Sequence, residues 1–215
     1  MAGHPTSPPS ELVAPRRFGL PGRAVLPRPL RRRVAAFDAR VDRGFDVLRG
    51  RPVVDRTFYA LSELGDFSIL WLLLGAARGL RSDADAAAAV RLGACLVGES
   101  IVVNGIIKSL FSRTRPVWDQ HRPHRLRRPR SSSFPSGHAS AAFAAAALLG
   151  EGRRTRPLYC GLALVVASSR VHVKIHHPSD VVAGIALGAL IGEVARRAWP
   201  VPPPACADPE GIPVR

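Results

Sequence analysis

The apolar residues of this chain follow two patterns, one amphipathic and one continuous. Between residues 34 and 48, apolar side chains recur every three or four positions, with aspartates and arginines between them. This spacing corresponds to one helix face, formed here by Val34, Phe37, Val41, Phe45 and Leu48. The pattern predicts an amphipathic helix that lies at a membrane surface or packs on the domain. Gly50 ends this helix, and Pro52 begins a second, short one.

Five apolar stretches follow, at residues 67–77, 86–111, 139–150, 158–167 and 181–195. A helix needs about 20 apolar residues to cross the roughly 30 Å hydrocarbon layer of a bilayer. Most of these stretches are shorter, but flanking residues extend most of them, and the mean hydropathy of the chain is only +0.07. The favoured fold is an all-α, multi-helix membrane bundle of about five apolar helices, preceded by the amphipathic helices. A soluble helical bundle is the alternative.

The two ends of the chain differ in composition from the middle. Residues 1–33 are rich in proline and arginine and lack periodicity, which predicts a disordered basic arm without a cleavable signal peptide. The tail is again rich in proline, and Trp199 beside two arginines is typical of an anchor at the membrane interface. The predicted units are the arm 1–33, interfacial helices 34–65, a helical bundle 66–199 and a disordered tail 200–215.

The chain is strongly basic, with 31 Lys+Arg against 16 Asp+Glu and a net charge of +15. This charge favours contact with phosphates, whether of nucleic acid, anionic lipid or an anionic substrate, and a mere compositional bias is the alternative. Zinc-ligand spacing, aromatic RNA-binding motifs and basic-region heptads are absent from the sequence, which argues against nucleic acid. Three cysteines form neither a disulfide framework nor a metal-binding spacing.

Three motifs carry candidate chemistry. They read KSLFSRTRP at 108–116, PSGH at 135–138 and SRVHVKIHHPSD at 169–180. In order and spacing they resemble the signature of the type 2 phosphatidic acid phosphatase (PAP2) superfamily. That signature is Lys-x6-Arg-Pro, then Pro-Ser-Gly-His, then Ser-Arg-x5-His-x3-Asp. The resemblance covers residues 66–197.

The last motif has chemical meaning in its own right. Pro178 suits the first position of a helix, which places Asp180 in the first turn and His176 just before it. A carboxylate so placed can bond one ring nitrogen of His176, fix its tautomer and leave the other nitrogen free to attack. Arg170 supplies a planar, permanently charged fork for a phosphate-like group.

The resemblance implies a role for each motif residue. His176 attacks phosphorus to form a phosphohistidine, Asp180 orients it, and His138 protonates the leaving oxygen and later activates water. The implied phosphate-binding residues are three cations and a helix start, namely Lys108, Arg115, Arg170, Ser136 and Gly137. We expect neither a cofactor nor a metal, because the sequence offers no carboxylate cluster for Mg²⁺. A metal pair of His172 and His176 conflicts with the role of His176 as nucleophile.

The predicted function is that of a multi-pass cell-membrane lipid phosphatase. Its substrate is a lipid phosphomonoester or diphosphate, either phosphatidate-like or polyprenyl. The alternatives are a vanadium-dependent haloperoxidase, a soluble non-specific acid phosphatase, and a non-catalytic module that binds nucleic acid or anionic membranes. We expect a lipid phosphate and the membrane as partners, and no nucleic acid.

Several polar residues near the motifs have two interpretations. Glu99 and Asn104 lie in an apolar stretch, where polar groups either join helices or support a site; joining helices is favoured for Asn104. Lys174 either touches substrate or reaches solvent. His177, before Pro178, is expected to line the pocket rim.

Gly184, Gly188 and Gly192 recur every four residues in the last apolar stretch. Such a stripe lets another helix approach closely. Packing within the chain is the favoured use, and a homodimer contact is the alternative.

The side of the membrane is predicted from the arginines. The ends of the apolar stretches that carry the motifs must share one face with the N-terminal arm. This face holds more of the arginines than the other, both in the region before Leu61 and between the first and second motifs. Because basic loops tend to stay in the cytoplasm, the site is expected on the cytoplasmic face.

Overall fold

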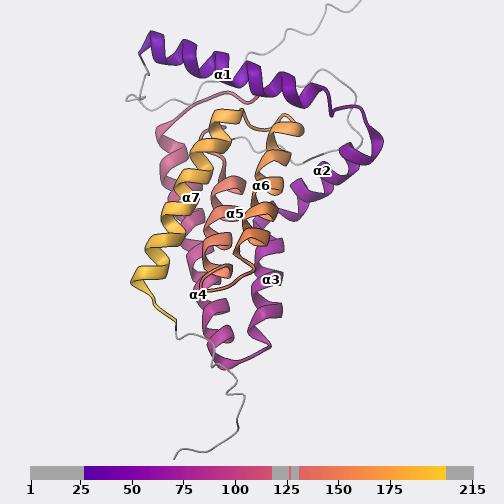
Figure 1. Cartoon of the computed structure of the whole chain (residues 1–215). Helices are drawn as coiled ribbons and strands as arrows, with labels where there is room; N and C mark the ends of the chain where they lie inside the picture. The colour runs from indigo at the N-terminus through magenta and orange to yellow at the C-terminus, as the bar shows by residue number, and fades with distance from the viewer. Residues whose placement is uncertain (1–26, 118–125, 127–130, 202–215) are drawn as a thin grey trace, which may run out of the picture.

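The computed structural model describes residues 27–117, 126 and 131–201, and it is all-α within these ranges (Figure 1). In chain order the helices are α1 (Arg28–Asp46), α2 (Pro52–Leu64), the short η1 (Asp66–Ser68), α3 (Ile69–Gly79) and α4 (Asp83–Ser100). A π-helical segment η2 (Ile101–Ile106) and a 3₁₀ segment η3 (Ile107–Leu110) extend α4, and α5 (Gly137–Leu149), α6 (Arg156–His172) and α7 (Pro178–Ala198) follow. The predicted all-α bundle is confirmed, and each apolar stretch corresponds to one of the helices α3 to α7.

The predicted arm and tail lie largely outside the described residues. Helix α1 begins at Arg28, inside the predicted arm 1–33, so the last residues of that range are helical rather than disordered. Pro29 lies in the first turn, where a missing N–H costs no helix hydrogen bond. The arginine-rich start of α1 therefore belongs to the helix.

Helix α5 forms the centre of the bundle, between α4, α6 and α7 (Figure 1). It is rich in alanine, and most of its residues are buried. The glycine stripe of α7 packs against it, and a Cβ added at Gly188 would lie 2.0 Å from the carbonyl oxygen of Ser140. The stripe is thus used inside the chain, and its buried glycines Gly184, Gly188 and Gly192 leave no surface for the alternative homodimer contact.

The exterior of the bundle is apolar. Two segments, Asp83–Leu110 and Pro178–Ala198, are long and apolar enough to cross a membrane, and α2 with α3 forms a third candidate that is bent by 66°. Large apolar side chains are exposed on several helices, among them Leu73, Val90, Ile101, Leu158, Leu190 and Val194. Apolar surface of this extent is typical of membrane contact.

Helix α1 lies across the end of the bundle at which α7 begins (Figure 1). Arg49, just after α1, donates to the carbonyl oxygens of Val171 and His172 at 2.8 and 2.9 Å. On α2, Asp55 lies 2.8 Å from Nε2 of His172. These contacts fix α1 and α2 on the C-terminal end of α6, next to the third motif.

Candidate active site

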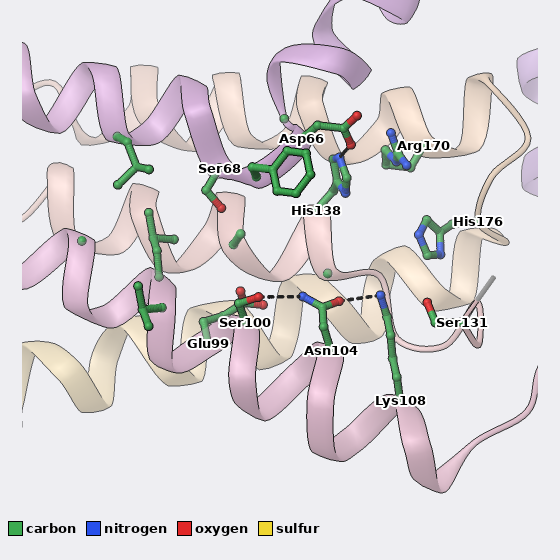
Figure 2. A pocket seen from close by; sticks show the side chains of 18 of the residues that line it. Asp66, Ser68, Glu99, Ser100, Asn104, Lys108, Ser131, His138, Arg170 and His176 are labelled. Atoms are coloured by element: carbon green, nitrogen blue, oxygen red, sulfur yellow. Dashed lines mark hydrogen bonds and ion pairs between the residues drawn. The ribbon is translucent and has the colours of Figure 1, made fainter. Parts of the chain in front are cut away.

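A cavity of about 480 Å³ opens where the three motifs meet, at the start of α5 and the end of α6 (Figure 2). The predicted site residues that line it are Lys108, Arg115, Gly137, His138, Arg170 and His176. Asp180 and Ser136 do not line it; both are fully buried behind the cavity wall. The fold therefore brings together, around one cavity, residues that are far apart in the sequence.

Three cations face this cavity from different elements. Nζ of Lys108, on η3, donates to Oδ1 of Asn104 at 2.6 Å. Nη1 of Arg115 donates to the carbonyl oxygen of Ile175 at 3.0 Å and lies 3.3 Å from Nε2 of His176. Arg170, which is 2% exposed, donates to the hydroxyl and carbonyl of Ser62 on α2. The chain leaves η3 at Phe111, whose backbone is extended, and Pro116 keeps Arg115 out of helical geometry as the chain passes the cavity.

His176 is held with Nε2 towards the cations. Its Nδ1 lies 2.7 Å from the carbonyl oxygen of Ser133. Because a carbonyl only accepts, this hydrogen bond requires the proton on Nδ1 and leaves Nε2 unprotonated, with its lone pair accepting from Nη1 of Arg115. Burial, together with the charges of Arg170, Arg115 and Lys108, lowers the pKa of His176 well below 6.5. The ring is therefore neutral and suited to nucleophilic attack.

Asp180 does not make the direct hydrogen bond to His176 that the sequence predicts. Its Oδ2 lies 3.8 Å from Nδ1 of His176, too far for a hydrogen bond. The reason is its place in the first turn of α7, where Oδ2 accepts from the backbone N–H of His177 at 2.9 Å. Oδ1 accepts from Nη1 of Arg113 at 2.6 Å. Asp180 thus faces the imidazole without a hydrogen bond to it, and Ser133 makes the direct contact.

His138 points from the first turn of α5 towards the break between α2 and α3 (Figure 2). Its Nε2 lies 2.9 Å from Oδ1 of Asp66, which also lines the cavity. Gly65 allows this approach, since a Cβ there would lie 2.8 Å from Cδ2 of His138. Asp66 is a site residue that motif spacing alone does not reveal. The break itself is marked by positive φ angles at Phe67 and Ser68, a conformation that is uncommon outside functional sites.

At the start of α5, a capping serine and a glycine let a neighbouring side chain lie close to the helix backbone. The Oγ of Ser136 accepts from the backbone N–H of Ala139 at 3.4 Å and caps the helix. A Cβ at Gly137 would lie 2.6 Å from Oδ1 of Asn104, so a larger residue there would displace the amide that holds Lys108. Asn104 therefore supports Lys108 in the cavity and also packs on α5, so it serves both of the uses that the sequence indicates. Glu99 is buried and also lines the cavity.

The remaining polar candidates lie outside the cavity. Lys174 pairs with Asp42 of α1 at 2.5 Å, and its φ of 52° closes the C-terminal turn of α6. His177 caps α7 and lies 3.1 Å from the carbonyl oxygen of Thr114, away from the pocket rim where it was expected. His172 stacks on Phe58 with ring centroids 4.4 Å apart. Within the described ranges, no group of three potential metal-binding side chains is found.

A sequence profile of the PAP2 superfamily matches residues 88–201, more than half of the chain. The chain belongs to the PAP2 superfamily. Decaprenylphosphoryl-5-phosphoribose phosphatase from Mycobacterium tuberculosis is 35% identical to it over 145 residues, which cover 67% of this chain and 80% of that protein. The predicted family and the predicted phosphatase activity are confirmed.

Crystal structures of other PAP2 proteins share the fold. A transmembrane PAP2-type phosphatidylglycerolphosphate phosphatase from Bacillus subtilis has a TM-score of 0.61 at 21% identity, over 77% of this chain and 85% of that one. LpxE from Aquifex aeolicus has a TM-score of 0.60 at 24% identity, over 74% of this chain and 94% of that one. These similarities, with the apolar exterior, identify a membrane protein with a PAP2-type bundle.

Proposed function

We propose that this PAP2 protein releases phosphate from a membrane lipid through a phosphohistidine on His176. The main support is the position of its neutral Nε2, 3.3 Å from Arg115, in a cavity that Lys108 and Arg170 also line. A phosphate held by these cations would present phosphorus to the lone pair of Nε2. In many enzymes, charged and polar groups placed around a developing negative charge make the largest single contribution to stabilising the transition state.

In the proposed first step, Nε2 of His176 forms a bond to phosphorus while the bond to the leaving oxygen breaks. His138 enters this step as an imidazolium, which the carboxylate of Asp66 at 2.9 Å stabilises, and gives a proton to that oxygen, so that the product leaves as a neutral alcohol. The imidazole becomes positively charged and keeps its proton on Nδ1. The Ser133 carbonyl, at 2.7 Å, and the Asp180 carboxylate, at 3.8 Å, stabilise this charge.

In the second step, water attacks phosphorus and restores the enzyme. His138 has given up its proton and now accepts one from the water, while the bond between phosphorus and Nε2 breaks. Phosphate is released, and both histidines return to their starting states. The proposed route needs no metal, because Lys108, Arg115 and Arg170 balance the charge of the phosphate.

The far end of the cavity supports a lipid substrate. Beyond the polar groups, apolar side chains of α3 and α4 continue the lining, including Leu72, Leu96 and Val97. Val97 is also exposed on the outside of the bundle, where lipid would lie. A chain attached to the phosphate could pass along this apolar lining into the bilayer. The relative named as a decaprenylphosphoryl-5-phosphoribose phosphatase favours a polyprenyl-linked phosphomonoester.

An assay of the purified enzyme in detergent tests this proposal. Phosphate release is measured from polyprenyl-linked monophosphates, polyprenyl diphosphate and phosphatidate, together with halide oxidation in the presence of vanadate. We expect phosphate release, fastest from the polyprenyl-linked monophosphate, and no halide oxidation. Absence of release from all three lipids, or vanadate-dependent oxidation, would contradict the proposal.

We also propose that the active site faces the cytoplasm. The exposed arginines of α1 support this orientation, since α1 lies at the same end of the bundle as the cavity. Single cysteines replacing Ser10 and Ser131, in a background without the native cysteines, report the side. We expect an impermeant thiol reagent to leave both unmodified in intact cells and to label both after lysis. Labelling of both in intact cells would reverse the assignment.

A further inference from the structure

We propose that Arg113 and Asp38 are positioning residues for the nucleophile, and that they make helix α1 part of the catalytic assembly. Arg113 lies inside the first motif but is not one of its defining residues, and Asp38 lies far from all three motifs. This inference rests on the proposed role of His176. It adds residues that act on the imidazole through Asp180 and Ser133.

The side chain of Arg113 joins two carboxylates. Nη1 donates to Oδ1 of Asp180 at 2.6 Å, and Nη2 donates to Oδ2 of Asp38 at 2.5 Å. Nη1 also donates to the hydroxyl of Ser179 at 2.8 Å. A planar guanidinium can serve these partners together, whereas a lysine ammonium acts as a single point of charge. Arg113 therefore fixes the carboxylate that lies 3.8 Å from the ring of His176.

The backbone of Arg113 holds the other partner of the ring. Its carbonyl oxygen accepts from the N–H of Ser133 at 3.0 Å, and its own N–H donates to Oγ of Ser132 at 3.2 Å. Ser133 is the residue whose carbonyl accepts from Nδ1 of His176. Both groups that face Nδ1 are thus connected to one residue, Arg113.

Asp38 completes the arrangement from α1. Along the whole length of α1, which the structure describes, Asp38 is the one buried residue. Its Oδ1 accepts from the backbone N–H of Ser179 at 2.8 Å, and its Oδ2 accepts from the hydroxyl of Ser179 at 3.0 Å. The same carboxylate pairs with Arg113. Asp38 therefore fixes both Arg113 and the first turn of α7, where Asp180 lies.

The charges of the hydrogen-bonded group Asp38, Arg113 and Asp180 suit the proposed reaction. Asp38 and Asp180 are both buried and carry two negative charges, of which Arg113 balances one. The one negative charge left over lies on the Nδ1 side of His176, opposite the cavity cations, and complements the positive charge that a phosphohistidine intermediate places on the imidazole. Without Arg113, two buried carboxylates would lose their common partner, which is costly. We expect the variants to lower the rate of phosphoryl transfer rather than to weaken substrate binding. The reason is that the cations that would bind the phosphate do not belong to the hydrogen-bonded group of Asp38, Arg113 and Asp180.

The test compares Arg113→Gln, Arg113→Lys and Asp38→Asn in the purified full chain. Arg49→Gln is the matched control, because Arg49 also pairs with two aspartates and is even more buried than Arg113, but it bonds the backbone of α6 rather than the groups that face His176. For each variant, kcat and KM, the inhibition constant of inorganic phosphate, and the thermal unfolding temperature in detergent are measured, with kcat expressed per folded enzyme. We expect Arg113→Gln and Asp38→Asn to lower kcat about 10–100-fold, as is typical of residues that orient a reacting group. KM and the phosphate inhibition constant should stay unchanged.

Further results separate positioning from stability. Arg113→Lys should restore little of the rate, since one ammonium cannot hold both carboxylates, and Arg49→Gln should lower the unfolding temperature while keeping kcat. If Arg113→Gln does not fold, Asp38→Asn carries the same test. Wild-type kcat in folded Arg113→Gln or Asp38→Asn, or an equal loss in Arg49→Gln, would overturn the inference. An active His176→Ala enzyme, measured alongside, would instead overturn the proposed function.

Discussion

Replacing Asp180 with asparagine isolates the contribution of its charge. Asparagine keeps the size of the side chain and can still accept from the N–H of His177, but it no longer carries the charge that faces His176 at 3.8 Å. Two unit charges at that distance interact by about 4 kcal/mol at an effective dielectric constant of about 20. If the imidazole carries about half of a charge in the transition state, the loss is about 2 kcal/mol. Because 1.36 kcal/mol corresponds to a tenfold change in rate, kcat should fall roughly 30-fold.

The assay is steady-state phosphate release by Asp180→Asn in detergent, with thermal unfolding as the control for folding. Asp38 still balances the charge of Arg113 in this variant, so the loss of rate reports the charge of Asp180 itself. We expect a lower kcat with an unchanged inhibition constant for inorganic phosphate, because the cavity cations are intact. A folded variant with wild-type kcat would refute the electrostatic role of Asp180.

Three further predictions concern the nucleophile, metals and the lipid path. The pKa of His176 is lowered well below 6.5, so the neutral form persists as the pH falls; the acid limb of kcat/KM should lie below pH 6.5, and a limb above it would argue against His176 as the attacking base. Activity should survive excess EDTA, and a loss that Mg²⁺ restores would contradict the metal-independent route. Gly93 lines the cavity and has nothing within 4 Å of an added Cβ, so Gly93→Leu should raise KM for a long-chain lipid phosphate but not for a short-chain one. Gly98→Leu, on the exposed side of the same helix, is the control, and equal effects in both variants would refute the path.

Much of the cavity could be predicted because local chain chemistry fixes where the motifs lie. Pro116 keeps Arg115 extended, Gly137 begins α5, and Pro178 begins α7. These points determine which side chains project from the helix ends. The order and spacing of three motifs then leave few ways to place the cations and both histidines together.

The residues that contact and position the motif residues could not be predicted from the sequence. Asp66 and Ser133 contact histidines, and Asp38 contacts Arg113; these partners are distant in sequence, and such contacts depend on how the helices pack. The position of Asp180 was predicted, but its main partner was not, because Arg113 is one of many arginines in the chain. Similarly, a glycine stripe predicts a close helix neighbour without saying that the neighbour is α5.

The measurement that tests the central claim most directly is trapping of the phosphoenzyme. The enzyme is mixed with a lipid substrate labelled in its phosphate, quenched within its first turnover, and digested to locate the label. The account predicts an acid-labile, base-stable phosphate on His176 in the wild type and none in His176→Ala. His177→Ala, the neighbouring control, should still form it. A labelled residue other than His176, or phosphate release by a folded His176→Ala enzyme, would contradict the account.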